Sequence, residues 1–140
     1  RIGSSGYSAR IGSSGDYAQI GSSGDSAQIG SSGYSARIGS SGYSARIGSS
    51  GDYAQIGSSG DSAQIGSSGY SAQIVSEGQK AVITSAGKAT SVTAKNGAWI
   101  SLAEFDIDGN CIGFAMGCIG KGGLKPDTRY VAKGGKLVEP

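Results

Sequence analysis

The chain of 140 residues has no histidine, and it contains only one tryptophan, two phenylalanines and two cysteines. The absence of histidine matters for chemistry, because the abundant serines have no imidazole to activate them as nucleophiles. We therefore expect no enzyme. The shortage of large side chains, together with 27 glycines, excludes an ordinary bulky core, so the core must be thin and built mostly of Ile, Ala, Ser and Gly.

The two cysteines, Cys111 and Cys118, are too few for a zinc site, since without histidine the other ligands would have to come from a second subunit. They are seven residues apart, and on one strand an odd separation places two side chains on opposite faces, which disfavours a disulfide. We expect two buried or half-buried thiols and no metal or other cofactor.

Charge is balanced in this sequence. The formal net charge is +2, and within residues 1–72 four arginines offset four aspartates. This balance argues against a nucleic-acid partner. No apolar run approaches the roughly 20 residues that span a bilayer, and no signal-peptide pattern is present, so we expect no membrane partner. The chain starts inside the phase of its own repeat, which indicates a longer parent protein.

The dominant feature is an exact internal repeat. Residues 1–36 recur without change as residues 37–72, and each copy contains four nine-residue units of the form R/Q-I-G-S-S-G-(Y/D)-(S/Y)-A. A unit this short cannot bury a hydrophobic face alone, so it must stack on its neighbours in a solenoid. A flexible linker is the competing interpretation, but a linker has no reason to place Ile at every ninth position from Ile2 to Ile74.

Each unit has the pattern of one short strand and one corner. In Ala9-Arg10-Ile11 the apolar residues flank a charged one, which predicts a strand with Ala and Ile facing inward, and Ser13 continues the inward phase. Because nine is odd, the alternation must break once per unit. We expect the corner at Gly15-Asp16, since glycine and aspartate suit turn conformations.

The charge pattern predicts how many units form one turn of the solenoid. With one unit per turn, Asp16 would lie over Asp25, and like charges would stand about 4.8 Å apart. With two units per turn, no charge lies on a like charge, because Tyr alternates with Asp and Arg alternates with Gln along each side. The sequence thus predicts an all-β fold: a flattened β-helix or β-roll with eighteen residues per turn.

The repeat decays toward the C-terminus, as solenoids do at their ends. We expect a solenoid over residues 1–96, regular over 1–74 and degenerate over 75–96, with a one-residue slip near Lys95-Asn96-Gly97. The sequence of residues 97–140 predicts a small antiparallel β cap that shields the last strand edges, with a hairpin turn at Asp108-Gly109. The residues expected to form the cap are Trp99, Ile100, Leu102 and Phe105.

Three motifs resemble ion or phosphate sites but lack required residues. The Asp-containing units resemble the calcium-binding nonapeptide of secreted toxins, yet half of the units carry Tyr there, so about six to eight oxygen ligands are hard to assemble. Residues 106–110 resemble an EF-hand loop, but Gly117 stands where its glutamate is needed. Gly120-Lys121 resembles a phosphate loop, but Gly122 replaces the Ser or Thr. A calcium-binding β-roll therefore remains only an alternative.

The I-G-S-S-G-D-Y/S-A-Q units, the segment Gly97–Phe105 and the tail Lys125–Tyr130 resemble a group of uncharacterised bacterial and bacteriophage repeat proteins. In that group similar repeats precede a G-S-W-I-T-L-A-E-W-type segment and a K-x-D-T-x-Y tail. The resemblance covers nearly the whole chain. It implies a bacterial or phage origin and a variable repeat number, and it leaves the bacterial cytoplasm and a phage particle open as locations.

These observations favour a non-enzymatic structural or interaction protein, which is a rigid spacer or a self-assembly module. The expected partner is a second copy, through lateral rows or through end-to-end stacking at the uncapped N-terminal end. A glycan-binding or other ligand-binding module is the alternative, and ice binding through regular hydroxyl rows is a further one. The candidate interaction surface comprises Tyr7, Arg10, Tyr17, Tyr34, Arg37, Tyr43, Arg46, Tyr53 and Tyr70.

Overall fold

A computed structural model describes all residues from 1 to 140 and contains fifteen strands and no helix. The strands of the repeat region are β1 (Ile2–Ser4), β2 (Arg10–Ser13), β3 (Gln19–Ser22), β4 (Gln28–Ser31), β5 (Arg37–Ser40), β6 (Arg46–Ser49), β7 (Gln55–Ser58), β8 (Gln64–Ser67), β9 (Gln73–Ser76), β10 (Val82–Ser85) and β11 (Ser91–Ala94). The C-terminal strands are β12 (Trp99–Phe105), β13 (Cys111–Cys118), β14 (Arg129–Lys133) and β15 (Lys136–Val138). No helix could therefore span a membrane.

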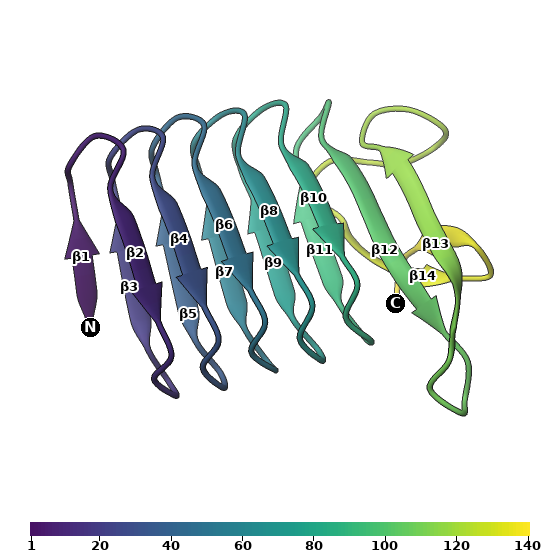
Figure 1. Cartoon of the computed structure of the whole chain (residues 1–140). Coiled ribbons are helices and arrows are strands. Elements are labelled where there is room, and N and C mark those ends of the chain that lie inside the picture. Colours follow the sequence, from purple (N-terminus) through teal and green to yellow (C-terminus); the bar gives the residue numbers. More distant parts are fainter.

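The strands form two facing sheets that run the length of the molecule (Figure 1). Sheet A contains β1, β3, β5, β7, β9, β11, β14 and β15, and sheet B contains β2, β4, β6, β8, β10, β12 and β13. Within the repeats the neighbouring strands are parallel, and Ile2 lies beside Ile20, eighteen residues later. The predicted β-solenoid, with two nine-residue units per turn, is confirmed.

The core is a thin layer between the two sheets. Each inner coil contributes two isoleucines and two alanines, such as Ile38, Ala45, Ile47 and Ala54, all of which are buried. The first serine of each unit also points inward, as the alternation predicted. Seven of these buried hydroxyls have no hydrogen-bond partner: those of Ser22, Ser31, Ser40, Ser49, Ser58, Ser67 and Ser76.

The corner of each unit lies one residue later than expected. The turn is at Asp16-Tyr17, and Tyr17, not Gly15, adopts a positive φ of 56°. From Gly24 onward, the glycine at this position of the unit is needed for another reason. A Cβ added at Gly33 would overlap the carbonyl oxygen of Gly15 in the preceding coil. The glycine therefore permits close stacking of coils. Of the expected corner pair Gly15-Asp16, only Asp16 lies in the turn, and the expectation that glycine supplies the turn conformation was wrong.

The solenoid ends through a change of register and then of strand direction. Val82 of β10 lies beside Trp99 of β12, a separation of seventeen residues, which confirms the one-residue slip before β12. Strand β13 then pairs antiparallel with β12, and β14 pairs antiparallel with β11. The Asp108-Gly109 turn joins β12 to β13 as expected, with Gly109 at a φ of 86°.

Side chains tie the C-terminal strands to the solenoid. The Glu104 carboxylate accepts hydrogen bonds from the backbone N–H groups of Gly134 (2.6 Å) and Gly135 (2.7 Å), which form the turn between β14 and β15. Lys95 forms an ion pair with Asp127 (2.6 Å), and this hydrogen bond raises the pKa of Lys95. These contacts hold the β14–β15 hairpin against both sheets.

Candidate functional site

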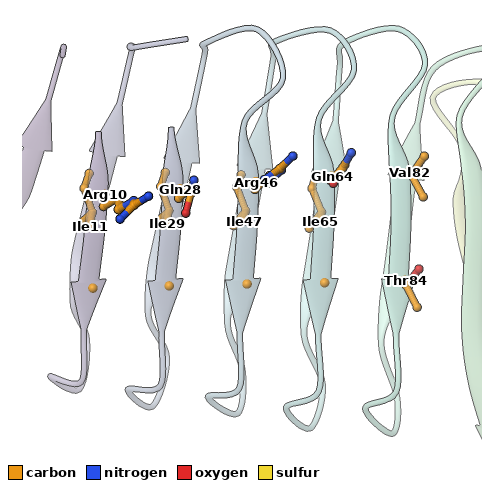
Figure 2. A pocket seen from close by; sticks show the side chains of 14 residues that line it. Arg10, Ile11, Gln28, Ile29, Arg46, Ile47, Gln64, Ile65, Val82 and Thr84 are labelled. Carbon is orange, nitrogen blue, oxygen red and sulfur yellow. The ribbon is translucent and has the colours of Figure 1, made fainter. Parts of the chain in front are cut away.

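The outer face of sheet B carries an open groove that crosses the strands, which we call the sheet B groove (Figure 2). Its wall is a row of alternating Arg and Gln, and its floor is a row of glycines. The groove has a volume of about 790 Å³, and it extends to β10, where Val82 and Thr84 replace Gln and Gly. The residues of the wall are Arg10, Gln28, Arg46 and Gln64, and those of the floor are Gly12, Gly30, Gly48 and Gly66.

The groove follows directly from the alternation within each strand. Ile and the first Ser of a unit point inward, so the Arg or Gln and the following Gly point outward. Because glycine has no side chain, the floor of the groove is bare backbone. A Cβ added at Gly48 would meet nothing within 4 Å. This glycine therefore keeps the surface open and is not required by packing.

The groove is positively charged and contains no acidic group. Arg10 and Arg46 form no ion pair, since the Lys95–Asp127 pair is the single salt bridge in the structure. Strands β2, β4, β6, β8 and β10 contain no Asp or Glu. Two strand spacings separate the two arginines, or about 9.6 Å. Both guanidinium groups are thus free to bind an anion.

Sheet A has a similar groove with different ends. Its wall contains Arg1, Gln19, Arg37, Gln55 and Gln73, and Val75 stands in the glycine row at its end. Beyond it, Ser91 of β11 occupies the wall position next to Gln73 and is buried. The predicted interaction residues Arg10 and Arg46 therefore share one face, while Arg37 lies on the opposite face.

The wall of the sheet B groove continues into an exposed tryptophan. Trp99 lies beside Val82, which itself follows Gln64 in the same row, and the Trp99 side chain is 54% exposed. Of the residues expected in the cap, Ile100 and Leu102 are buried in the core and Phe105 is half-buried. Trp99 instead points outward.

Four tyrosines form a ladder along one edge of the solenoid, which we call the tyrosine edge. This edge consists of the turns that lead from sheet B to sheet A, and Tyr17, Tyr34, Tyr53 and Tyr70 each come from a successive coil. The ring centroids are 5.8, 5.4 and 5.5 Å apart, and each pair of rings meets edge to face. The opposite edge holds Tyr7 and Tyr43, which join no ladder.

The sequence contains a signal for this ladder that the charge pattern alone did not show. Asp16 and Asp52 alternate with Tyr34 and Tyr70 on this edge, which indicates a tyrosine in every second coil only. Tyr17 and Tyr53 occupy the next position of the unit, and they fill the missing coils. An exposed row that alternates between two adjacent positions can thus still be continuous in space.

The aspartates at the corners connect neighbouring coils. The Asp25 carboxylate accepts a hydrogen bond from the backbone N–H of Tyr43 (2.8 Å). Asp16, Asp52 and Asp61 make the same bond to Tyr34, Tyr70 and Gln79. Each aspartate therefore binds the following coil and is already committed to a structural contact.

A second exposed surface lies on β13, the last strand of sheet B. Ile112, Phe114 and Met116 are at least half exposed, and no strand pairs with the free edge of β13. A cleft of about 350 Å³ beside this strand is lined by Trp99, Met116, Lys121 and Lys136, among others. Strands β12 and β13, together with the loop that joins them, thus carry most of the exposed large apolar side chains outside the tyrosines.

The two cysteines and the Asp106 loop were examined in the sequence as possible metal sites. Both cysteines are free thiols. Cys118 is buried, as expected, whereas Cys111 is exposed, contrary to the expectation of a buried or half-buried thiol.

The Asp106 carboxylate accepts backbone hydrogen bonds from Asn110 (2.8 Å) and Asp108 (3.0 Å), and the bond from Asn110 is the main reason why the pKa of Asp106 is lowered. Asp106 therefore organises the hairpin loop. No group of three or more Cys, Asp or Glu side chains is placed to hold a metal ion.

The architecture defines the class of protein: a two-sheet β-solenoid with eighteen residues per coil and two grooved outer faces. Comparisons with protein-family models, curated proteins and solved structures gave no match.

Proposed function

We propose that this protein is a non-enzymatic structural module, a rigid rod that acts as a spacer and displays identical side-chain rows at fixed intervals. The observation that carries this proposal is the register, which keeps a step of eighteen residues without interruption from β1 to β11. A rod built in this way has a length that is set by the number of repeats.

The connections between coils support rigidity at three places. The parallel strands form hydrogen-bonded ladders in both sheets. At the corners, the backbone N–H of Tyr17 donates to the carbonyl oxygen of Tyr34 (2.7 Å), and equivalent bonds follow along both edges. The aspartate bond adds a third link. Bending at one junction would therefore break several hydrogen bonds together.

Changing the repeat number tests the spacer function. Deleting residues 37–72 removes one perfect 36-residue copy, and duplicating them adds one, while the ends of the chain stay the same. We expect small-angle X-ray scattering to show a length change of two strand spacings, about 9.6 Å, with a constant cross-section. A length that does not follow the copy number, or a cross-section that changes with it, contradicts a rigid rod.

Self-association is a second candidate function, and the surface of β13 favours it. This eight-residue edge strand contains no charged residue, whereas natural edge strands are commonly protected by charges or proline. Two copies could pair their β13 strands antiparallel about a two-fold axis, which brings Phe114 of one copy near Phe114 of the other. No like charges would meet in such a pair.

The oligomeric state over a concentration series tests this second candidate. Light scattering of the wild-type chain should show a dimer that dissociates on dilution. Phe114→Lys should give a monomer at all concentrations, because a lysine on the free edge opposes pairing. Val75→Lys, which changes an exposed apolar residue on sheet A, is the matched control and should leave the dimer intact. A wild-type monomer at high concentration would exclude assembly through β13.

A further inference from the structure

The sheet B groove, together with Trp99, has the features of a site for an extended anionic polymer. We infer that it binds a linear acidic glycan in which every second sugar carries a carboxylate. The glycan would lie parallel to the solenoid axis, across the six neighbouring strands from β2 to β12.

The charges of the groove are complementary to such a ligand. Arg10 and Arg46 are unpaired, and the repeat strands of sheet B contain no acidic residue. A free guanidinium binds a carboxylate through two parallel hydrogen bonds, which is a stronger contact than bonds between neutral groups. The anion-binding groups of this face thus have no internal partner to compete with a ligand.

The spacing of the arginines along the wall indicates which kind of polymer fits the groove. One coil advances by about 4.8 Å. A pyranose in an extended β-linked chain advances by a similar distance, so one sugar matches one coil and an acidic disaccharide matches the interval from Arg10 to Arg46. Nucleic acid fits poorly, because it carries a charge about every 3.4 Å along each strand. Two arginines at two-coil spacing leave most of those phosphates unmatched.

The remaining groups of the groove suit a sugar chain. Gln28 lies between the two arginines in the wall, and Gln64 follows Arg46 (Figure 2). The amides of both glutamines can donate hydrogen bonds to sugar hydroxyls and accept hydrogen bonds from them. The glycines of the floor lie side by side in register on neighbouring strands, so they form a row beside this wall. A bare backbone floor lets a flat ring approach closely, which a row of larger side chains would prevent.

Trp99 distinguishes this face from sheet A. Its half-exposed indole occupies the wall position two strands beyond Gln64, where the last sugar of a hexasaccharide would lie. An aromatic ring presents an apolar surface on which the C–H face of a sugar can stack. On sheet A the row instead ends at Gln73 and the buried Ser91, with no exposed aromatic residue. We therefore assign the ligand to sheet B.

The single tryptophan provides a direct measurement on the full-length chain. Hyaluronan hexasaccharide, which alternates a uronic acid with an N-acetylated sugar, is the probe, and neutral chitohexaose is its uncharged counterpart. We expect the hyaluronan fragment to change the Trp99 fluorescence at saturable concentrations and to bind more weakly as salt rises. Chitohexaose should bind at least tenfold more weakly.

Matched substitutions on sheet A and sheet B test which of the two outer faces binds the glycan. Arg46→Gln, which introduces the residue found in alternate coils, should lower the affinity in calorimetry at least tenfold, since a charged hydrogen bond is lost. Arg37→Gln makes the same change on sheet A and should have no effect. Gly48→Val should block the floor, while Gly39→Val on sheet A should not. Neither glycine has atoms near an added Cβ or a positive φ, so the fold tolerates both changes.

Several results would overturn the assignment. These are the absence of hyaluronan binding up to millimolar concentration, equal losses in Arg37→Gln and Arg46→Gln, equal affinity for chitohexaose, and tighter binding of a single-stranded oligonucleotide. A rod without a glycan site has the same length as a rod with one, so this site and the proposed spacer function fail separately.

Discussion

The Asp52 carboxylate accepts a hydrogen bond of 2.7 Å from the backbone N–H of Tyr70, one coil further along the solenoid. The Asp25 bond to Tyr43 joins the preceding pair of coils at the opposite edge. Each junction within the regular repeats has one such bond, and the edge alternates from junction to junction. This alternation requires two different coils, which explains why the sequence repeats after 36 residues and not after eighteen.

The first prediction concerns this link. Asp52→Ala should lower the free energy of unfolding by about 1–2 kcal/mol, because it removes one charged acceptor and leaves the Tyr70 N–H without it. Asp52→Asn keeps a carbonyl oxygen at the same position and should cost much less. Urea denaturation measures both. Asp108→Ala, an exposed aspartate whose carboxylate makes no hydrogen bond, is the control. Equal stabilities for the alanine and asparagine variants would contradict the role of the acceptor.

Two glycines of the same nine-residue unit should respond in opposite ways to alanine. Gly51→Ala places a Cβ on the carbonyl oxygen of Gly33, so we expect a loss of about 1–3 kcal/mol or more. Gly48→Ala adds a methyl group to open space in β6 and should stabilise the fold by about 0.5–1 kcal/mol, because it restricts the unfolded chain. Thermal unfolding of the two variants gives the comparison. The same sign for both would mean that close stacking of coils is not the reason for the glycine.

Buried serines provide a third test. Ser58 is buried and its hydroxyl has no partner, so Ser58→Ala should be neutral or stabilise by about 1 kcal/mol. The Ser85 hydroxyl bonds that of Thr90 (2.8 Å) and accepts from the backbone N–H of Gly87 (3.1 Å). Ser85→Ala should therefore destabilise by about 1–2 kcal/mol. If Ser58→Ala were as harmful as Ser85→Ala, the inner serine row would have a partner of its own.

The coil could be predicted from sequence because its determinants repeat. The like-charge argument from Asp16 and Asp25 requires only the order of residues, and it led to the observed eighteen-residue register. The outward orientation of Trp99 could also be predicted from the sequence. Ala98-Trp99-Ile100 follows the same pattern as Ala9-Arg10-Ile11, which places Trp99 on the outer face with the arginines.

Other features could not be predicted, because they depend on contacts between coils. The need for glycine at Gly33 comes from a carbonyl group eighteen residues earlier, and a local turn pattern does not reveal it. The left-handed conformation then falls on Tyr17, a residue type for which no local preference predicts it. The tyrosine ladder likewise requires the distance between rings at two different positions of the unit.

The hairpin loop at Asp106 should respond to acid. The backbone hydrogen bond from Asn110 is the main cause of the lowered pKa of Asp106. A lowered pKa means that the carboxylate supports the loop above the ordinary value of 3.8 and loses this support as the pH falls through the lower folded value. The amide resonances of Asn110 and Asp108 in an NMR titration should shift together below pH 3.8. Asp106→Asn should abolish this titration, and a shift that persists in this variant would assign it to another group.

The tyrosine ladder gives the last prediction. Tyr53 contacts Tyr34 and Tyr70 edge to face, and each such pair contributes about 0.5–1.5 kcal/mol. Tyr53→Ser should therefore lower the free energy of unfolding by about 1–3 kcal/mol. Serine already occupies the equivalent left-handed position at Ser44 and Ser62, so the backbone is not disturbed. Tyr43→Ser on the opposite edge, where no ring contacts Tyr43, should have a smaller effect. Denaturation followed by far-ultraviolet circular dichroism compares the two, and equal losses would mean that the ring contacts add no stability.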